Sequence, residues 1–329
     1  MNEPRLPRRA SGGHKGTFGT VAVVGGCAAP AESAGGPHMA GAPALAALGA
    51  LRSGAGLARL VCPASVLPTA IGLAPSATGI VLPTDSRGVI VAHEAAAVLD
   101  GLFADSDAVV IGPGLGGVGG PAATAVEAVS LRAVQQEEVP VVVDADSLNA
   151  LARIPELSRE FRAAAVLTPH PGELRRLGAA LKITHDPTDA AQRPLAAESL
   201  AQRLGCVVVL KGEGTLLRDW QRTWVCAHGH ACLATAGTGD VLAGVIAGLV
   251  AQWVRLPDPM LAKLPEAARR ALQADRGGSL DLFDAARAGV LVHALAGERW
   301  AATHEAAAGL LAAELAALVP VCAESIRAG

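Results

Sequence analysis

Residues 233–252 read LATAGTGDVLAGVIAGLVAQ, a turn of small residues followed at once by an apolar run. The turn contains, in order, Ala236, Gly237, Thr238, Gly239 and Asp240. The apolar residues after it recur at the spacing of a buried helix. The first N–H groups of a helix have no intrahelical partner, and the helix dipole adds positive charge there, so a glycine-rich start lets an anion approach closely. The stretch therefore predicts a buried helix whose first turn, formed by Gly237, Thr238 and Gly239, binds a phosphate.

Asp240 is the unexpected residue of this turn, because a carboxylate beside a phosphate site repels the ligand. A carboxylate there has a chemical task if it accepts the proton of a hydroxyl that attacks a phosphoryl group. The alternative is a plain helix N-cap after a glycine turn. That alternative explains Asp240 alone and not the whole Gly-Thr-Gly-Asp run.

Short β-branched runs alternate with Ala/Leu-rich helical stretches along most of the chain. Predicted strands begin at Thr20, Leu57, Asp107, Val139, Ala164 and Cys206, and predicted helices cover residues 42–53, 121–137 and 190–204. Continuous apolar strands separated by helices are typical of an α/β fold, with a mostly parallel sheet and helices on both faces. Ligands of such folds bind beyond the carboxyl ends of the strands. Glycine or polar clusters at 112–117, 144–147, 168–173, 211–215 and 236–240 fall at those ends, which predicts one long cleft.

The composition indicates a compact protein. Of 329 residues, 51% are hydrophobic and 17% charged, and the net charge of −3 gives no footprint for nucleic acid. The most apolar stretch, 241–254, is shorter than the ~18 residues of a membrane span, and six cysteines without a C-x-x-C pair suit a cytoplasmic location. We expect a single domain over 1–329, with a flexible, solvated tail at 1–13 (carrying Arg5, Arg8 and Arg9) and a surface insertion at 255–282.

The segment CAHGHAC holds four zinc-type ligands, Cys226, His228, His230 and Cys232. Alternate residues of an extended strand are spread along it, and the usual separation between ligand pairs is missing. A strand and loop leading to the phosphate turn is therefore favoured over a metal site, and we expect no bound metal within the protein itself.

Four further motifs have two interpretations each. GPGLGG, from Gly112, contains the G-x-G-x-x-G of a dinucleotide fold, but its position and the spacing to the next acids favour a glycine-rich edge or a tight turn. In GGHKGTFG, His14 and Lys15 contact an anion or belong to a solvated entry loop.

The other two motifs follow predicted strands. In TPHPGE, prolines flank His170 and present it at a strand end, whereas Glu173 is a functional acid or a plain first-turn residue. In LKGEGTLL, Lys211 precedes a glycine turn that suits either a strand–turn–strand hairpin or a nucleotide phosphate.

In this order and combination, these segments resemble the ADP- or ATP-dependent NAD(P)H-hydrate dehydratases, a ribokinase-like family of the YjeF C-terminal type. The resemblance is carried by HKGTFG (14–19), residues 41–57, VIGPGLG (110–116), DADSLN (144–149), TPHPGE (168–173), LKGEGT (210–215) and AGTGDVLAG (236–244), and it resumes at VLVHALAGE (290–298). It implies a ribokinase-like fold and repair of NADH or NADPH damaged by hydration of the nicotinamide ring. The ring hydroxyl would attack the terminal phosphoryl group of ADP or ATP, with Mg²⁺ on the phosphates, and the phosphate would then be expelled.

The resemblance also implies roles for individual residues. Asp240 would be the catalytic base, and the amides of residues 237–239 would form the anion hole. The hydrated dinucleotide would contact Ala42, Gly114, His170 and Asp240. The adenine nucleotide would be lined by Lys211, Gly212, Glu213, Gly214, Thr215 and Gly239.

Two departures from the family pattern precede the helix. The family usually has a Gly-Asn pair where this chain has Gly229 and His230, a change that can alter nucleotide preference or add a proton-sensitive group. The family turn commonly begins with glycine where this chain has Ala236, a change that is tolerable if that position does not need a positive φ. The resemblance further implies a separate NAD(P)H-hydrate epimerase as functional partner, since no epimerase domain precedes the motifs, and a homo-oligomer such as a tetramer.

Three other functions compete with this interpretation. A small-molecule kinase of the same fold, acting on thiazole or pyrimidine alcohols, would use the same Gly-Thr-Gly-Asp turn. A non-catalytic nucleotide sensor is the second alternative, with CAHGHAC as the change that abolishes turnover. An NAD-dependent dehydrogenase is the most distant of the three.

Overall fold

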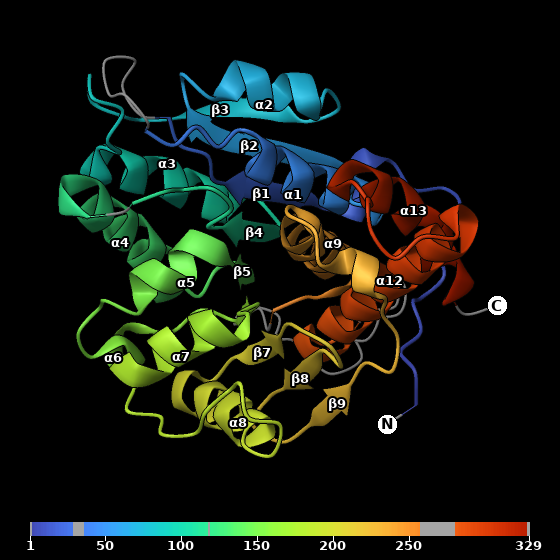
Figure 1. Ribbon diagram of the computed structural model, residues 1–329. Helices are drawn as coiled ribbons and strands as arrows, with labels where there is room; N and C mark the ends of the chain where they lie inside the picture. Colours follow the sequence, from blue (N-terminus) through green and yellow to red (C-terminus); the bar gives the residue numbers. More distant parts are fainter. Residues whose placement is uncertain (1, 29–35, 118, 257–279, 328–329) are drawn as a thin grey trace, which may run out of the picture.

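The computed structural model describes residues 2–28, 36–117, 119–256 and 280–327. Within these ranges nine strands form one sheet in the order β3-β2-β1-β4-β5-β6-β7-β8-β9 (Figure 1). Neighbours from β3 to β7 are parallel, and β8 and β9 extend the sheet as antiparallel strands. The strands are β1 (Thr20–Val24), β2 (Leu57–Pro63), β3 (Thr78–Leu82), β4 (Ala108–Ile111), β5 (Val141–Val143), β6 (Ala165–Leu167), β7 (Val207–Leu210), β8 (Leu216–Arg218) and β9 (Thr223–Val225).

Helices cover both faces of the sheet, because alternate strand residues point to opposite faces. One face, which includes Val21 and Val23 of β1, packs against α1 (Gly41–Arg52), α2 (Leu67–Leu73), α9 (Thr238–Trp253) and α12 (Leu282–His304). The other, which includes Ala22 and Val24, packs against α3 (Ala92–Asp105), α4 (Gly120–Gln135), α5 (Ala145–Leu151), α6 (Leu157–Glu160), α7 (Pro171–Ala180) and α8 (Arg193–Leu204). Helix α13 (Ala312–Ser325) lies outside α9 and α12 and forms a third apolar cluster with them (Figure 1).

The predicted α/β architecture is confirmed. Each of the six predicted strands is present, the LKGEGTLL segment forms the β7–β8 hairpin, and the predicted helices correspond to α1, α4 and α8. Sequence analysis missed β3 and β9. Strand β3 lies at the edge of the sheet with mostly exposed residues, and β9 has three residues, so neither shows a continuous apolar run.

Helix α9 packs almost backbone to backbone against α1, which fixes the position of its first turn. A Cβ atom on Gly244 would lie 1.9 Å from the carbonyl oxygen of Ala46, and one on Gly49 would lie 2.4 Å from that of Val241. The small residues of the apolar run are therefore required for this close approach.

The N-terminal segment differs in part from the predicted solvated tail. Leu6 is fully buried in the cluster around α13, and its N–H donates to the carbonyl of Ile326 at 3.0 Å. Arg9 donates to the carbonyl of Gly54 at 2.8 Å. Leu6 and its backbone hydrogen bond thus attach this segment to the C-terminal helices, whereas Arg5, Arg8 and Arg9 are exposed, as a solvated segment requires.

Two further expectations were a surface insertion at 255–282 and the lack of a membrane-spanning segment. Residues 257–279 lie outside the described residues, and with them most of the predicted insertion at 255–282. In the described ranges, no helix combines the length and the apolar character that a bilayer crossing requires.

Candidate active site

The carboxyl ends of the central parallel strands bring the polar motifs to one edge of the sheet. Gly112 follows β4, Asp144 follows β5, Thr168 follows β6 and Lys211 follows β7. Since these strands are parallel and adjacent, the four positions lie side by side. The first turn of α9 lies beside them, as the contacts of Lys211 show.

Lys211 connects this edge to α9. Its Nζ atom lies 2.7 Å from Oδ1 of Asp144 and 3.8 Å from Oε2 of Glu173. The same Nζ atom would lie 3.6 Å from a Cβ atom built on Gly239, in the first turn of α9. An ammonium group and a helix N-terminus therefore share one location, an arrangement that favours a phosphate.

The carboxylates around this ammonium have perturbed pKa values. Burial raises the pKa of Asp240 to about 7, with a further rise from Asp144 that Lys211 opposes. Burial likewise raises the pKa of Glu173 to about 7. For Lys211, burial acts to lower the pKa, but the carboxylates of Asp144 and Glu173 outweigh it and the pKa is raised. The cluster thus contains a carboxylate that can exchange a proton near neutral pH.

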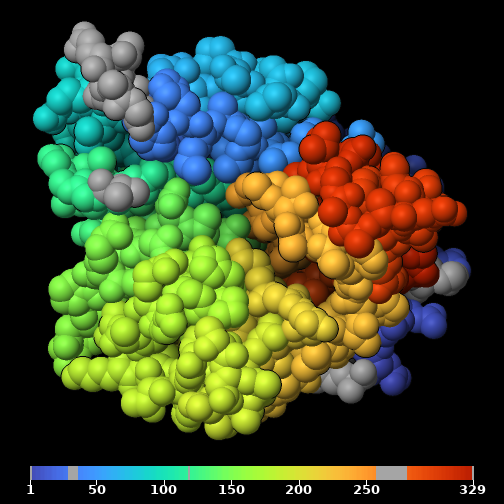
Figure 2. All heavy atoms as spheres, in the orientation of Figure 1, coloured from blue at the N-terminus to red at the C-terminus, as the bar shows by residue number. Residues whose placement is uncertain are grey.

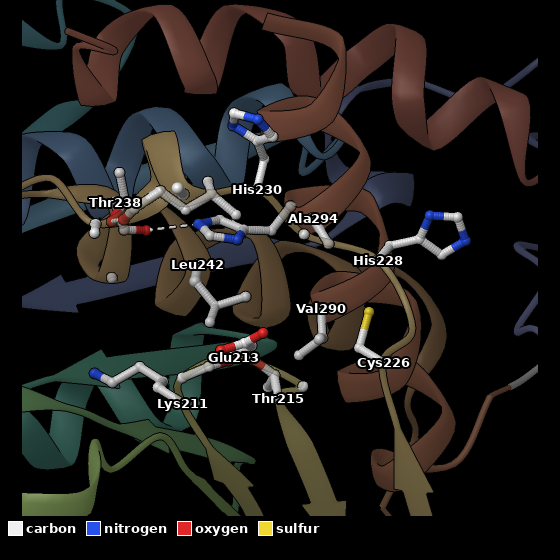
Figure 3. Close-up of a pocket in the computed structure, with 18 of the residues that line it drawn as sticks. Lys211, Glu213, Thr215, Cys226, His228, His230, Thr238, Leu242, Val290 and Ala294 are labelled. Carbon is white, nitrogen blue, oxygen red and sulfur yellow. Dashed lines mark hydrogen bonds between the residues drawn. The ribbon is translucent and has the colours of Figure 1, made fainter. Parts of the chain in front are cut away.

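A cavity of about 790 Å³ opens next to Lys211. The β7–β8 turn forms one wall, the segment between β9 and α9 a second, and α9 with α12 a third (Figure 3). Figure 2 shows the surface hollowed between the yellow and the orange and red parts of the chain. The cavity is lined by the predicted nucleotide residues Lys211, Gly212, Glu213, Gly214, Thr215 and Gly239, together with Thr238. This volume lies within the range of small-molecule sites.

The side chain of Thr238, the first residue of α9, stabilises the turn that precedes this helix. Gly237 is the N-cap residue with a φ of 90°, a conformation that favours glycine. The hydroxyl of Thr238 donates toward the carbonyls of Leu233 (2.9 Å) and Thr235 (2.8 Å). Thr238 therefore uses its hydroxyl to fix the turn, and an anion would be met by the backbone N–H groups that follow.

Of the residues predicted for the dinucleotide, Ala42 and Gly114 lie farther from the cavity in sheet order, whereas His170 follows β6, between the strands that end at Asp144 and Lys211. Gly114, with a φ of +66°, is close to Ala42, since a Cβ atom on Gly114 would lie 3.2 Å from that of Ala42. His170 is the N-cap residue of α7, and its Nδ1 atom accepts from the N–H of Gly172 at 3.0 Å. Burial and Lys211 lower its pKa. In sheet order, Gly114 follows β4 and the cavity begins at Lys211 after β7, with Asp144 and His170 at the strand ends between them.

Two residues of the site, Asp144 and His293, were not assigned a role from the sequence. Asp144 is buried, accepts from the Thr168 hydroxyl at 2.8 Å and pairs with Lys211. His293 of α12 lines the cavity, and its Nε2 atom lies 2.9 Å from the carbonyl oxygen of Thr238. Asp144 belongs to the DADSLN motif and His293 to VLVHALAGE. The sequence signals that could have identified them are a polar residue at a strand end for Asp144 and a histidine within an apolar helix for His293.

Glu173 combines both interpretations that its sequence left open. Its Oε2 atom accepts from the N–H of His170 at 2.8 Å, as in a capping box, and also faces Lys211. It is thus a helix-start residue and a member of the charged cluster.

His14 and Lys15 lie away from the cavity. Lys15 begins η1 (Lys15–Phe18), and His14 is its N-cap residue. This turn precedes β1 and therefore lies at the amino edge of the sheet, opposite the site. Both side chains are exposed, and His14 caps η1 by accepting from the N–H of Gly16 at 3.1 Å. Within this chain they are entry-loop residues.

The CAHGHAC segment forms a cavity wall. Cys226 and Cys232 are buried, and Cys232 contacts the carbonyl of Gly297. His228 and His230 line the cavity (Figure 3). Among the described residues, no three histidine, cysteine or acidic side chains are placed together to hold a metal ion.

A mostly parallel sheet covered by helices on both faces, with a glycine-rich turn and a cavity at its carboxyl edge, defines an α/β protein of the ribokinase-like fold. A family model described as NAD(P)H-hydrate dehydratase matches residues 34–320, and the chain belongs to this family.

Three known proteins illustrate the relationship. The bifunctional NAD(P)H-hydrate repair enzyme Nnr of Coxiella burnetii is 35% identical over 95% of this chain and 52% of its own length. The ADP-dependent (S)-NAD(P)H-hydrate dehydratase of Neisseria meningitidis is 35% identical over 94% of this chain and 86% of its own. The crystal structure of the ADP/ATP-dependent dehydratase of Bacillus subtilis, co-crystallized with ATP/Mg²⁺, has a TM-score of 0.69, 27% identity and coverage of 99% and 100%. The chain spans about half the length of the bifunctional relatives it matches.

Proposed function

We propose that this chain dehydrates hydrated NADH or NADPH at the expense of ADP or ATP and so restores the reduced dinucleotide. The observation that carries the proposal is the position of the Lys211 ammonium, beside the first turn of α9 and in the wall of the cavity. The family membership supports it, since relatives named for this reaction match nearly the whole chain.

The nucleotide would bind in the cavity with its terminal phosphate at Lys211 and the start of α9. Gly212 and Gly214 have positive φ values of 132° and 59°, so the β7–β8 turn can follow a ligand without a side chain in the way. The N–H groups around Gly239 would stabilise the charge that develops on the transferred group.

The dinucleotide would contact Ala42, Gly114 and His170, and its ring hydroxyl would lie near Asp240. The hydroxyl oxygen forms a bond to the terminal phosphorus, the bond from phosphorus to the nucleotide oxygen breaks, and Asp240 takes the hydroxyl proton. The ring nitrogen lone pair then expels phosphate, the adjacent ring carbon loses a proton, and the ring double bond returns. Phosphorylation matters because phosphate is a far better leaving group than hydroxide.

Mg²⁺ fits the donor set of this site. It prefers oxygen ligands, keeps several waters and is usually bound by one or two carboxylates plus substrate phosphates. Glu173 supplies such a carboxylate, with its Oε2 atom 3.8 Å from Nζ of Lys211, and a closed protein cage is not required. When bound, the ion would neutralise charge on the phosphates.

The test is the near-ultraviolet absorbance of dihydronicotinamide after purified protein, Mg²⁺ and either ADP or ATP are added to hydrated NADH. A nucleotide-dependent rise with equimolar phosphate is expected, and comparing the two nucleotides identifies the donor. No rise with folded protein would overturn the proposal. Phosphorylation of a thiazole or pyrimidine alcohol would then favour the kinase, and nucleotide binding without turnover would favour the sensor.

Asp240→Asn tests the proposed base. The variant should lose turnover by about 10²-fold or more, because proton transfer contributes on that order, while ADP binding stays within about threefold. The matched control is Asp105→Asn, an exposed residue at the end of α3, which should retain full activity. Turnover retained in Asp240→Asn would exclude Asp240 as the base.

A further inference from the structure

The segment between β9 and η2 (Ala231–Leu233) forms one wall of the cavity that opens beside Lys211. Residues 226–231 all line the cavity. Gly229 has a φ of +142°, so the backbone here adopts a conformation that residues with side chains rarely occupy. Because this segment precedes η2 and follows β9 without regular secondary structure, contacts with other elements must fix its conformation.

Glu298 of α12 supplies that contact. Its Oε1 atom accepts from the N–H of Gly229 at 2.9 Å, and its Oε2 atom lies 3.1 Å from Nδ1 of His228. One carboxylate thus binds both a backbone amide and a side chain of the same loop, 69 and 70 residues away in sequence.

His228 contacts a second carboxylate on its other nitrogen. Its Nε2 atom lies 3.1 Å from Oε1 of Glu3, in the N-terminal segment. A carboxylate accepts hydrogen bonds, and only the imidazolium form has two N–H donors, so this geometry belongs to protonated His228. The hydrogen bond to Glu298, followed by that to Glu3, raises the pKa of His228 against a lowering by burial.

The same helix holds the rest of the wall. The Sγ atom of Cys232 contacts the carbonyl of Gly297 at 3.4 Å, and His293 contacts the carbonyl of Thr238. Helix α12 therefore contacts the connection between β9 and α9 at three points, through Glu298, Gly297 and His293.

We propose that Glu298 is a positioning residue for the nucleotide site, which fixes the cavity wall through the amide of Gly229 and the imidazolium of His228. The proposal rests on the proposed function, because it takes the cavity as the nucleotide site. Glu298 itself need not touch the nucleotide. Its effect should appear in nucleotide affinity and in the pH dependence of that affinity.

Glu298→Gln is the first test. The amide oxygen can still accept from Gly229, but the charge that pairs with His228 is lost, so the dissociation constant for ADP, measured by calorimetry, should rise about tenfold. Turnover at saturating nucleotide should change less than about twofold. The matched control is Glu305→Gln, an exposed glutamate at the end of the same helix, which should bind ADP like the wild type.

The pH profile separates this role from a merely structural one. Wild-type affinity for ADP should be high while His228 is protonated and should fall as pH rises through its raised pKa. Glu298→Gln lowers that pKa and moves the fall to lower pH. Glu3→Gln, which leaves Gly229 untouched, should move it in the same direction by a smaller amount, and it serves if Glu298→Gln folds poorly.

The outcomes distinguish the two proposals. If the wild type binds neither ADP nor ATP, the proposed function fails, and the positioning role fails with it. If the wild type binds nucleotide and Glu298→Gln and Glu3→Gln show the same affinity and the same pH profile, only the positioning role of Glu298 is overturned.

Discussion

The Nζ atom of Lys211 lies 2.7 Å from Oδ1 of Asp144, although 67 residues separate them in the sequence. Asp144 is buried and also accepts from the hydroxyl of Thr168. This pair places a fixed ammonium at the edge where β5 and β7 end. A phosphate entering the cavity would meet a cation whose orientation is already set by a carboxylate on its far side.

Asp144→Asn should destabilise the protein, because it leaves the Lys211 charge without its nearest partner. Removing one member of a buried ion pair costs about 3 kcal/mol. The Thr168 hydroxyl can still donate to the asparagine oxygen, so the loss belongs to the charge. The free energy of unfolding in urea, with and without ADP, measures it.

Asp100→Asn is the control for this prediction. Asp100 pairs with Arg132 at 2.5 Å, but its side chain is 53% exposed. Exposed ion pairs contribute about 0 to 1 kcal/mol, so this variant should unfold close to the wild type. Equal destabilisation by both substitutions would contradict the special position of Asp144.

Glu173→Gln tests the pH dependence of stability. Burial first, and Asp144 in addition, raise the pKa of Glu173 to about 7 from the ordinary 4.5, against the opposing effect of Lys211. Because the folded state binds this proton more tightly than the unfolded state, the stabilisation is complete below the ordinary pKa and is lost as pH rises through about 7. Relative to Glu173→Gln, which cannot titrate, the wild type should lose about 3 kcal/mol of unfolding free energy between pH values below 4.5 and above 7.

The control is Glu94→Gln. Glu94 occupies the same third position of its helix, α3, but its side chain is 56% exposed. Its stability should follow the wild-type curve from about pH 5 to about pH 8. If the wild type and Glu173→Gln also gave parallel curves, the raised pKa of Glu173 would be refuted.

Arg193, the first residue of α8, should affect nucleotide affinity indirectly, because it hydrogen-bonds to the backbone of the β7–β8 turn. Its guanidinium donates to the carbonyls of Glu213 (2.7 Å) and Leu210 (3.0 Å) and so spans the turn that begins at Lys211. We expect Arg193→Gln to raise the KM for nucleotide about tenfold with a smaller change in kcat.

Arg193→Lys should recover only part of this affinity, because an ammonium keeps the charge and loses the planar fork. Arg203→Gln, an exposed arginine at the other end of α8, is the matched control and should leave the KM unchanged. Full recovery by lysine would show that charge alone matters, against the geometric role proposed for Arg193.

Much of the fold was predictable because local patterns and tertiary structure agree. The apolar run after Asp240 is buried along its whole length, and the central strands read as continuous β-branched runs because helices cover both faces. The β7–β8 hairpin was predictable for the same reason, since glycines between two apolar runs indicate a turn. The nucleotide-binding role of residues 211–215 stays a prediction.

The remainder depends on contacts that no local pattern encodes. The burial of Leu6 needs contacts with α9, α12 and α13, which begin more than 230 residues further along the chain. The partners of Lys211 and Gly229 lie 67 and 69 residues away, so their pairing appears only when the topology is known. Edge strand β3 was missed because its exposed residues lack the apolar signal on which the prediction relied.

Two glycine-to-alanine substitutions within helices should have opposite effects. At Gly244 in α9, a Cβ atom would lie 1.9 Å from the carbonyl oxygen of Ala46, so Gly244→Ala must push α1 and α9 apart and should cost about 3 kcal/mol or more. At Gly101 in α3, a Cβ atom would meet nothing within 4 Å, so Gly101→Ala should stabilise the protein by about 0.5 to 1 kcal/mol through helix propensity. The free energies of unfolding of both variants, measured in urea, test this difference. Because the first turn of α9 is positioned by the packing of α9 against α1, Gly244→Ala should also weaken ADP binding. Equal stability of the two variants would show that the close approach of α1 and α9 does not constrain the sequence.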